Sequence, residues 1–167
     1  MAFTRAAAAC RYEGLARDLI LQFKYGRRIV LGRTLAELMT RRARRLGLAD
    51  TADLVMAVPL HEKRLGERGF NQAGILAQRI AAAIGCPYAE DILIRCTETR
   101  AQTDLDRHAR AANVKGAFEV RDRIRVAGAT VLLVDDVMTT GSTLSECAAA
   151  LRRAGAGEVN VLVAARD

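Results

Sequence analysis

The segment VLLVDDVMTTGST, residues 131–143, constrains the fold more than any other part of this chain. It opens with an apolar run typical of a buried β-strand, continues with the adjacent acids Asp135 and Asp136, and ends in small polar residues around Gly141. A helix cap is the simplest explanation of the polar residues, because Asp, Ser and Thr are preferred caps. One residue is enough to cap a helix, whereas nine positions here hold two acids, three threonines, a glycine and a serine. The segment therefore predicts a strand-to-helix turn that also binds a ligand.

Size and composition limit the class of protein. The 167 residues suit one domain, and 26 basic against 19 acidic residues give a net charge of +7, which favours anionic partners. The four cysteines form no CxxC pair, so the sequence predicts neither a zinc site nor a disulfide framework. No apolar run approaches the roughly 18 residues of a membrane helix, and the N-terminal alanine run lacks the apolar core of a secretory signal. We expect a cytoplasmic protein without membrane insertion and leave its oligomeric state open.

Periodic apolar positions outline alternating strands and helices. Two helices are expected before residue 50, with apolar faces formed by Leu15, Leu19, Ile20 and Phe23, then by Leu31, Leu35, Leu38 and Met39. Strands are expected over 53–60, 91–95, 116–120, 130–136 and 159–165, with helices over 71–84 and from about 144 to Gly155. Residues 96–115 are predicted to form a long loop, which is often functional. The fold class is therefore α/β, with a mostly parallel sheet flanked by helices over residues 51–167 and a small helical segment over 1–50 in the same unit.

The turn after the strand over 130–136 has the chemistry of a sugar-phosphate site. Glycine lets a ligand approach the main chain, and amides at the start of a helix, backed by the helix dipole, bind phosphate. The expected 5′-phosphate loop comprises Thr139, Thr140, Gly141, Ser142 and Thr143. Asp135 and Asp136 are expected to face the other end of the ligand, where they accept hydrogen bonds from sugar hydroxyls or hold hydrated Mg²⁺. The sequence contains neither a Walker A loop nor a GxGxxG fingerprint.

A second polar turn, VPLHEKRLGERGFNQA, spans residues 58–73. It does not complete the zinc motif HExxH, because Leu65 stands at the fifth position. It offers positive charge instead, from Lys63, Arg64 and Arg68, and guanidinium groups bind phosphate oxygens through paired hydrogen bonds. A solvated basic loop is the alternative explanation. We favour phosphate binding because this turn also follows a strand, and loops at the carboxyl ends of parallel strands converge on one crevice.

Both turns resemble known motifs. LLVDDVMTTGST is similar to the phosphoribosyl pyrophosphate (PRPP) binding signature of type I phosphoribosyltransferases, and VPLHxxRxxxRGFNQA resembles the hallmark of the ComF family of competence-associated, phosphoribosyltransferase-like proteins. The similarity extends to YEGLARDLILQFKYG, residues 12–26, and to the long loop as RxxTRAQTDLDRHARAANVKGAF, so it covers nearly the whole chain. Longer ComF relatives carry an N-terminal cysteine-rich zinc module, which this chain is expected to lack.

The resemblance implies roles for individual residues. It places Leu60, His61, Arg64 and Arg68, with Lys63 beside them, on the pyrophosphate side of a PRPP site, and Mg²⁺ with the bound PRPP. It places Gln102, Arg110 and Asn113 on a loop that closes over the site. It does not identify the acceptor of the phosphoribosyl group.

Two functions follow from the resemblance. The first is a phosphoribosyltransferase that transfers 5-phosphoribosyl from PRPP to a nitrogenous acceptor and releases pyrophosphate. The second is a PRPP-binding adaptor, weak in catalysis, that serves uptake of single-stranded DNA during natural transformation and contacts DNA or DNA-uptake proteins. The basic run RRARR, residues 41–45, is compatible with DNA contact, although a solvated helix end explains it more simply. A PRPP-sensing regulator is a third alternative, for which no helix-turn-helix segment is evident.

Overall fold

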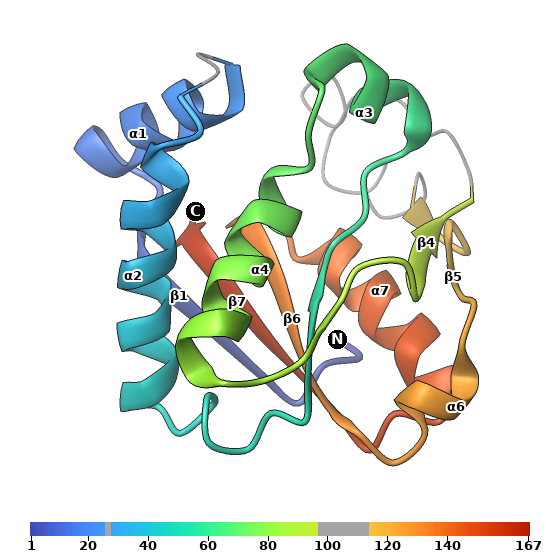
Figure 1. The fold of residues 1–167 in the computed structure, drawn as a ribbon. Helices are drawn as coiled ribbons and strands as arrows, with labels where there is room; N and C mark the ends of the chain where they lie inside the picture. The colour runs from blue at the N-terminus through green and yellow to red at the C-terminus, as the bar shows by residue number, and fades with distance from the viewer. Residues whose placement is uncertain (26–27, 97–113) are drawn as a thin grey trace.

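The computed structural model of the chain describes residues 1–25, 28–96 and 114–167 (Figure 1). The elements follow in the order β1 (Arg5–Arg11), α1 (Gly14–Tyr25), α2 (Leu31–Arg45), β2 (Leu54–Ala57), α3 (Glu62–Arg68), α4 (Gln72–Ile84), β3 (Tyr88–Ala89), β4 (Leu93–Arg95), β5 (Phe118–Val120), α6 (Arg123–Val126), β6 (Thr130–Met138), α7 (Ser142–Arg153) and β7 (Glu158–Arg166). None of the helices in these ranges is long and apolar enough to span a membrane.

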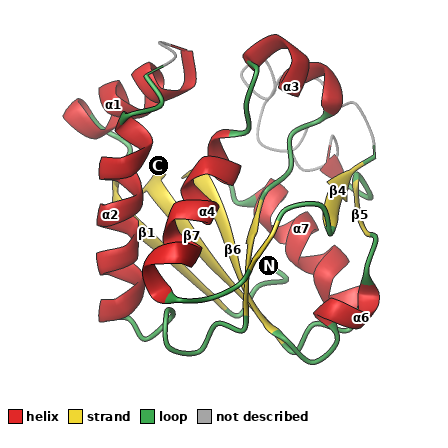
Figure 2. Ribbon diagram, viewed as in Figure 1, coloured by secondary structure: helices red, strands yellow, loops and turns green. Residues whose placement is uncertain are grey.

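Five strands form one parallel sheet in the order β1-β7-β6-β2-β3. Strand β6 lies between β2 and β7, with Leu133 opposite Met56 on one side and Val161 on the other. Helices α2 and α4 lie on one face of the sheet and α7 on the other (Figures 1 and 2). The middle of β6 and nearly all of β7 are buried on both faces, as a parallel sheet between two helical layers requires. The fold class expected from the sequence is confirmed.

The chain changes direction across the sheet between β2 and β6. The connection through α4 runs from β2 outward to β3, whereas the connection through α7 runs from β6 to β7 on the opposite side. Right-handed crossovers in opposite directions place their helices on opposite faces, which leaves a crevice where the two loops part. Ligands of open α/β sheets bind at such a switch point, beyond the carboxyl ends of the strands. Both polar turns of the sequence begin there.

The N-terminal residues differ from expectation in two respects. The two expected helices form, and Ile20, Phe23, Leu35 and Met39 are buried as their spacing predicts. Leu15 and Leu38, in contrast, are 75% and 38% exposed. Residues Arg5–Arg11, for which no strand was expected, form β1 and pair with β7 at the edge of the sheet. This strand ties residues 1–50 to the main sheet.

The turn over residues 58–73 also contains more structure than expected. The sequence was interpreted as a polar turn without a helix, but Glu62–Arg68 form the short helix α3. His61 caps this helix, because its Nδ1 accepts a hydrogen bond from the backbone N–H of Lys63 at 3.3 Å. Gly69 ends the helix with a φ of 79°, a left-handed conformation that glycine adopts without strain.

Candidate functional site

A cleft of about 710 Å³ opens at the switch point between β2 and β6. Its floor is the end of β6, and its walls come from α1, from the turn after β2 with the start of α4, and from the turn that leads into α7. Nine of the residues predicted for the site line it: Leu60, Arg64, Asp135, Asp136, Thr139, Thr140, Gly141, Ser142 and Thr143. The structure therefore brings together the two turns that the sequence singled out.

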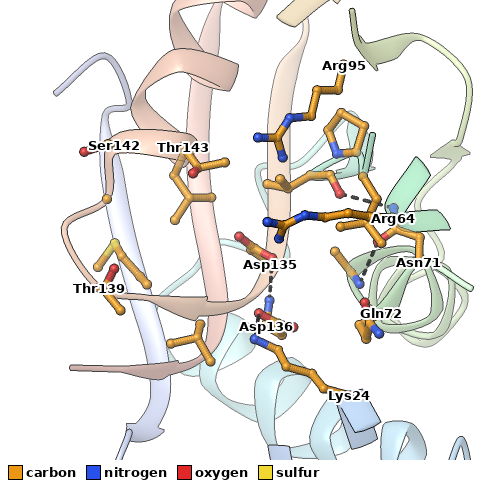
Figure 3. Close-up of a pocket in the computed structure, with 18 of the residues that line it drawn as sticks. Lys24, Arg64, Asn71, Gln72, Arg95, Asp135, Asp136, Thr139, Ser142 and Thr143 are labelled. Atoms are coloured by element: carbon orange, nitrogen blue, oxygen red, sulfur yellow. Dashed lines mark hydrogen bonds and ion pairs between the residues drawn. The ribbon is translucent and has the colours of Figure 1, made fainter. Parts of the chain in front are cut away.

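The two acids at the end of β6 are arranged differently from each other. Asp136 is buried and forms an ion pair with Lys24 of α1, whose Nζ lies 3.0 Å from the Asp136 Oδ1. The two side chains are 11% and 18% exposed, so the pair is shielded from solvent. The Asp135 Oδ1 accepts a hydrogen bond of 2.8 Å from the backbone N–H of Asp136 (Figure 3). Lys24 thus fixes one carboxylate, while the other extends into the cleft.

The same packing raises the pKa of one of the two acids. Burial, with repulsion from Asp136, raises the pKa of Asp135 to about 7, and Lys24 opposes this only in part. Burial alone lowers the pKa of Lys24, but the charge of Asp136, which also accepts its hydrogen bond, outweighs burial and leaves that pKa raised. A further cation or hydrogen-bond donor at Asp135 would therefore relieve the repulsion between the two carboxylates.

The turn after β6 forms the start of α7. Gly141 is the N-cap with a φ of 75°, so the cap position has no side chain to accept hydrogen bonds from the first helical turn. The hydroxyls of Thr140 and Ser142 are 2.9 Å apart, which holds the turn together in front of the helix. In Figure 3, Thr139, Ser142 and Thr143 lie on the opposite side of Asp135 from the arginines. Amides at a helix N-terminus are well suited to bind phosphate.

Two arginines form the other wall. In Figure 3, the guanidinium groups of Arg64 and Arg95 point from α3 and β4 toward Asp135. The ring of Phe118 supports Arg95, whose Cζ lies 5.5 Å from the ring centroid. Burial, followed by the positive charge of Arg64, lowers the pKa of Arg95. Two guanidinium groups that repel each other in this way are suited to share an anion with several negative charges.

Other predicted residues lie elsewhere. His61 caps α3 and Lys63 lies in its first turn, and neither is among the residues that line the described cleft. Arg68 is the last residue of α3, and its side chain is outside the described part of the structure. Gln102, Arg110 and Asn113, predicted for the closing loop, lie outside the described residues. Their roles remain predictions.

Several lining residues were not predicted. Lys24 and Arg95 were missed, as were Tyr12 and Asn71. Asn71 joins the two sides of its own turn, because its Nδ2 donates to the Val58 carbonyl at 3.2 Å and its Oδ1 accepts from the Ala73 N–H at 3.1 Å. The available signals were weak: Lys24 follows the core residue Phe23 in α1, and Arg95 ends the apolar run of β4.

The residues present fit Mg²⁺ only together with a ligand. Within the described ranges, no group of three or more His, Cys, Asp or Glu side chains could hold a metal. Mg²⁺ commonly binds through one or two carboxylates, substrate phosphates and water. Asp135 is the better protein ligand of the two acids, because the near oxygen of Asp136 already contacts Lys24.

Comparison with known proteins assigns the family. A profile of the phosphoribosyl transferase domain matches residues 67–167. The chain is 35% identical over 160 residues to the DNA utilization protein YhgH of Escherichia coli K12, covering 94% of this chain and 70% of that protein. The chain belongs to the ComF family. This member is also 36% identical to competence protein F of Haemophilus influenzae, covering 89% of this chain and 66% of that protein. It is 37% identical to YhgH of Salmonella typhimurium across 86% of its own length, and spans 63% of that relative.

Solved structures show the same fold. The ComF-family chain superposes with a TM-score of 0.57 and 24% identity on the allosteric regulatory enzyme of purine biosynthesis, covering 86% of this chain and 30% of that one. It superposes with a TM-score of 0.52 and 25% identity on the glutamine PRPP amidotransferase of B. subtilis, covering 78% of this chain and 25% of that one. These matches support the phosphoribosyltransferase-like architecture described above.

Proposed function

We propose that this chain binds PRPP in the cleft between β2 and β6. The observation that carries the proposal is the convergence of three kinds of group on one cleft: the turn at the start of α7, the acids Asp135 and Asp136, and the arginines Arg64 and Arg95. PRPP bears a 5′-phosphate, vicinal ribose hydroxyls and a diphosphate, which these three groups complement in that order along the cleft.

Each part of the cleft has a defined task in this proposal. The amides and hydroxyls of residues 139–143 bind the 5′-phosphate, backed by the dipole of α7. Asp136, positioned by Lys24, and Asp135 accept hydrogen bonds from the ribose hydroxyls. Arg64 and Arg95 bind the diphosphate. Mg²⁺ bound with the ligand supplies further neutralisation of the diphosphate charge.

We infer that this PRPP site serves the use of DNA. The relatives that resemble most of this chain are named for DNA utilization and competence, which favours the adaptor function over a housekeeping transferase. A PRPP-dependent transfer is the second candidate, favoured by the presence of groups for all three parts of the ligand in one cleft. In that reaction, the bond from the anomeric carbon to the diphosphate breaks, the diphosphate leaves with the bonding pair, and an acceptor nitrogen bonds that carbon and loses a proton.

Calorimetric titration with PRPP, with and without Mg²⁺, tests the binding proposal. We expect saturable binding that is stronger with Mg²⁺, and failure to bind would overturn both candidate functions. Pyrophosphate release in the presence of PRPP, Mg²⁺ and a panel of nucleobases then separates the two. Release above the rate without protein supports transfer, whereas binding without release supports the adaptor.

Replacing Arg95 by alanine is expected to weaken PRPP binding about ten-fold or more, because one of the two diphosphate-binding guanidinium groups is lost. Affinity for ribose 5-phosphate, which has no diphosphate, is expected to change less than two- to three-fold. Titration of the variant with both ligands measures this difference. Arg125→Ala, an exposed arginine on α6, is the matched control. Equal losses for the two ligands in Arg95→Ala would place Arg95 outside the diphosphate site.

A further inference from the structure

A second concave surface is lined by residues of α2 and α4. These two helices cover the face of the sheet opposite α7 (Figure 1). This α2–α4 groove has a volume of about 600 Å³ and shares no described lining residue with the cleft. Four arginines line it: Arg33, Arg41, Arg44 and Arg79. Glu37 is the one acid among its described lining residues. The groove is therefore a concentrated positive surface that the PRPP site does not use.

The fold alone does not account for this charge. Helix α2 needs its inner face, which includes Leu35 and Met39, for the core, but any polar residue would serve on the outer face. Arginines in the last turn of a helix complement the negative end of its dipole. That explanation does not cover Arg33, in the first turn of α2, where a cation is disfavoured and an ion pair with Glu37 compensates. It does not cover Arg79 either, which lies in the middle of α4.

Side-chain contacts hold Arg33 and Arg44 at separate places along the groove. The Arg44 Nη2 donates to the Ala83 carbonyl at 2.6 Å, which carries this side chain from α2 across to the end of α4. The Arg33 Nε lies 3.0 Å from the Glu37 Oε1. Arg33 and Arg44 are about 16 Å apart along the axis of α2, at 1.5 Å per residue. The positive charge thus extends along the groove and does not form a single point site.

The lining favours a polyphosphate chain over a protein partner. The floor is made of small side chains, Ala36, Thr40, Ala82 and Ala83. A docked peptide helix needs pockets for large apolar side chains, and the stacking of bases needs aromatic rings. The described lining has neither and consists mainly of alanine methyl groups and arginine guanidinium groups. Arginine forks bind repeated phosphate groups through paired hydrogen bonds without reading the bases.

We propose that the α2–α4 groove binds the sugar–phosphate backbone of single-stranded DNA, independently of its sequence. The choice of DNA as the polyanion rests on the DNA-related function proposed above. The inference that the groove binds a polyanion rests on its own geometry and charge. Its separation from the cleft allows DNA and PRPP to bind the same chain together. Such binding is expected to weaken with salt. In a plot of the logarithm of the binding constant against the logarithm of the salt concentration, each phosphate contacted contributes a slope of about −0.7.

Fluorescence anisotropy with a labelled thymidine 20-mer tests the proposal. The variant Arg41→Glu/Arg79→Glu reverses the charge of two exposed side chains of the groove. Within the described residues, neither side chain forms a hydrogen bond or ion pair that the substitution would break. We expect it to lower affinity for the oligonucleotide at 50 mM salt at least ten-fold and to flatten the salt dependence. The matched control Arg123→Glu/Arg125→Glu, on the exposed α6, changes the net charge equally and is expected to lose less than three-fold.

Other outcomes would overturn the proposal. If the two variants lost affinity for the oligonucleotide equally, net charge alone would explain the binding. Absence of binding by the wild-type chain at 50 mM salt would also overturn the proposal. Equal affinity for a duplex of the same length would exclude preference for a single strand, and equally effective competition by polyglutamate would indicate an acidic protein partner. PRPP titration of the same variants separates the two sites. Loss of DNA binding with unchanged PRPP binding supports the groove, whereas a wild-type chain that binds DNA but not PRPP contradicts only the proposed PRPP function.

Discussion

Replacing Asp135 by asparagine is expected to stabilise the chain at pH 8 and to abolish most PRPP binding. The asparagine side chain fills the same space, and its oxygen still accepts the hydrogen bond from the Asp136 N–H. The substitution removes a carboxylate whose pKa is raised to about 7 by burial and by Asp136. In the proposed site, it also removes the negative charge that accepts hydrogen bonds from the ribose, so PRPP affinity is expected to fall about ten- to hundred-fold.

The pH dependence follows from the direction of the pKa shift. The folded chain holds the Asp135 proton more tightly than the unfolded chain, whose aspartate pKa is near 3.9. The stability associated with that proton is fully present below pH 4 and is lost as the pH rises toward 7. Asparagine has no proton to lose. Its stabilising effect should therefore be small at pH 4 and grow to the order of 1–3 kcal/mol at pH 8.

Thermal unfolding of both proteins between pH 4 and pH 8 measures this effect. A gain of that size corresponds to a Tm increase of roughly 2–10 °C for a chain of this length. Asp18→Asn, an exposed acid on α1, serves as the control and should leave the Tm nearly unchanged. A lower Tm for Asp135→Asn at pH 8 would show that the carboxylate stabilises the fold, and would contradict its assignment as a group held ready for a ligand.

This opposition between stability and binding is typical of a functional site. A fold selected only for stability would not place two carboxylates side by side where burial and mutual repulsion raise the pKa of one of them to about 7. The repulsion between Asp135 and Asp136 is relieved when a ligand brings hydroxyl donors or a metal to the cleft. A bound ligand should therefore stabilise the chain more at pH 8 than at pH 5.

The turn from β6 into α7 could be predicted because all its determinants are local. The apolar run, the acids, Gly141 and the hydroxyl residues are adjacent in sequence, so the strand, the turn and the helix start follow directly. The convergence of the second turn on the same crevice follows from the general behaviour of parallel sheets. Arg64 was therefore found as well.

Residues that reach the cleft from distant elements could not be predicted in this way. Lys24 meets Asp136 because Phe23, fully buried beside it, fixes the end of α1 against α2. That packing depends on Gly32, where a Cβ would lie 3.0 Å from the Phe23 ring. Arg95 reaches the cleft because β4 pairs with β5 outside the main sheet and Phe118 supports its side chain. No sequence spacing encodes these tertiary contacts.

Strand β1 was missed for a related reason. Its sequence, RAAAACR, is poor in the β-branched and aromatic residues typical of strands. Its strand conformation comes from pairing with β7, where Ala6 lies opposite Val161 and Ala8 opposite Val163. Small side chains let helix α2 pack closely over this edge. Tertiary pairing here outweighs local propensity.

Replacing Lys24 by methionine is expected to reduce both stability and PRPP affinity. Methionine keeps the bulk of the apolar stem but leaves the Asp136 carboxylate, 11% exposed, without its cation at 3.0 Å. Removal of one partner of a shielded ion pair costs on the order of 2–4 kcal/mol of unfolding free energy. PRPP affinity is expected to fall at least ten-fold, because the carboxylate proposed to accept hydrogen bonds from the ribose hydroxyls is no longer held in place.

The double variant Lys24→Met/Asp136→Asn separates these two effects. It removes the unpaired charge, so urea unfolding should recover most of the stability lost in Lys24→Met. Calorimetric titration should find that PRPP affinity does not recover, because the double variant restores packing but not the positioned carboxylate. Recovery of both stability and affinity would show that the Lys24–Asp136 pair is structural only. If affinity remains low while stability returns, the ion pair links the packing of α1 to recognition of the ribose.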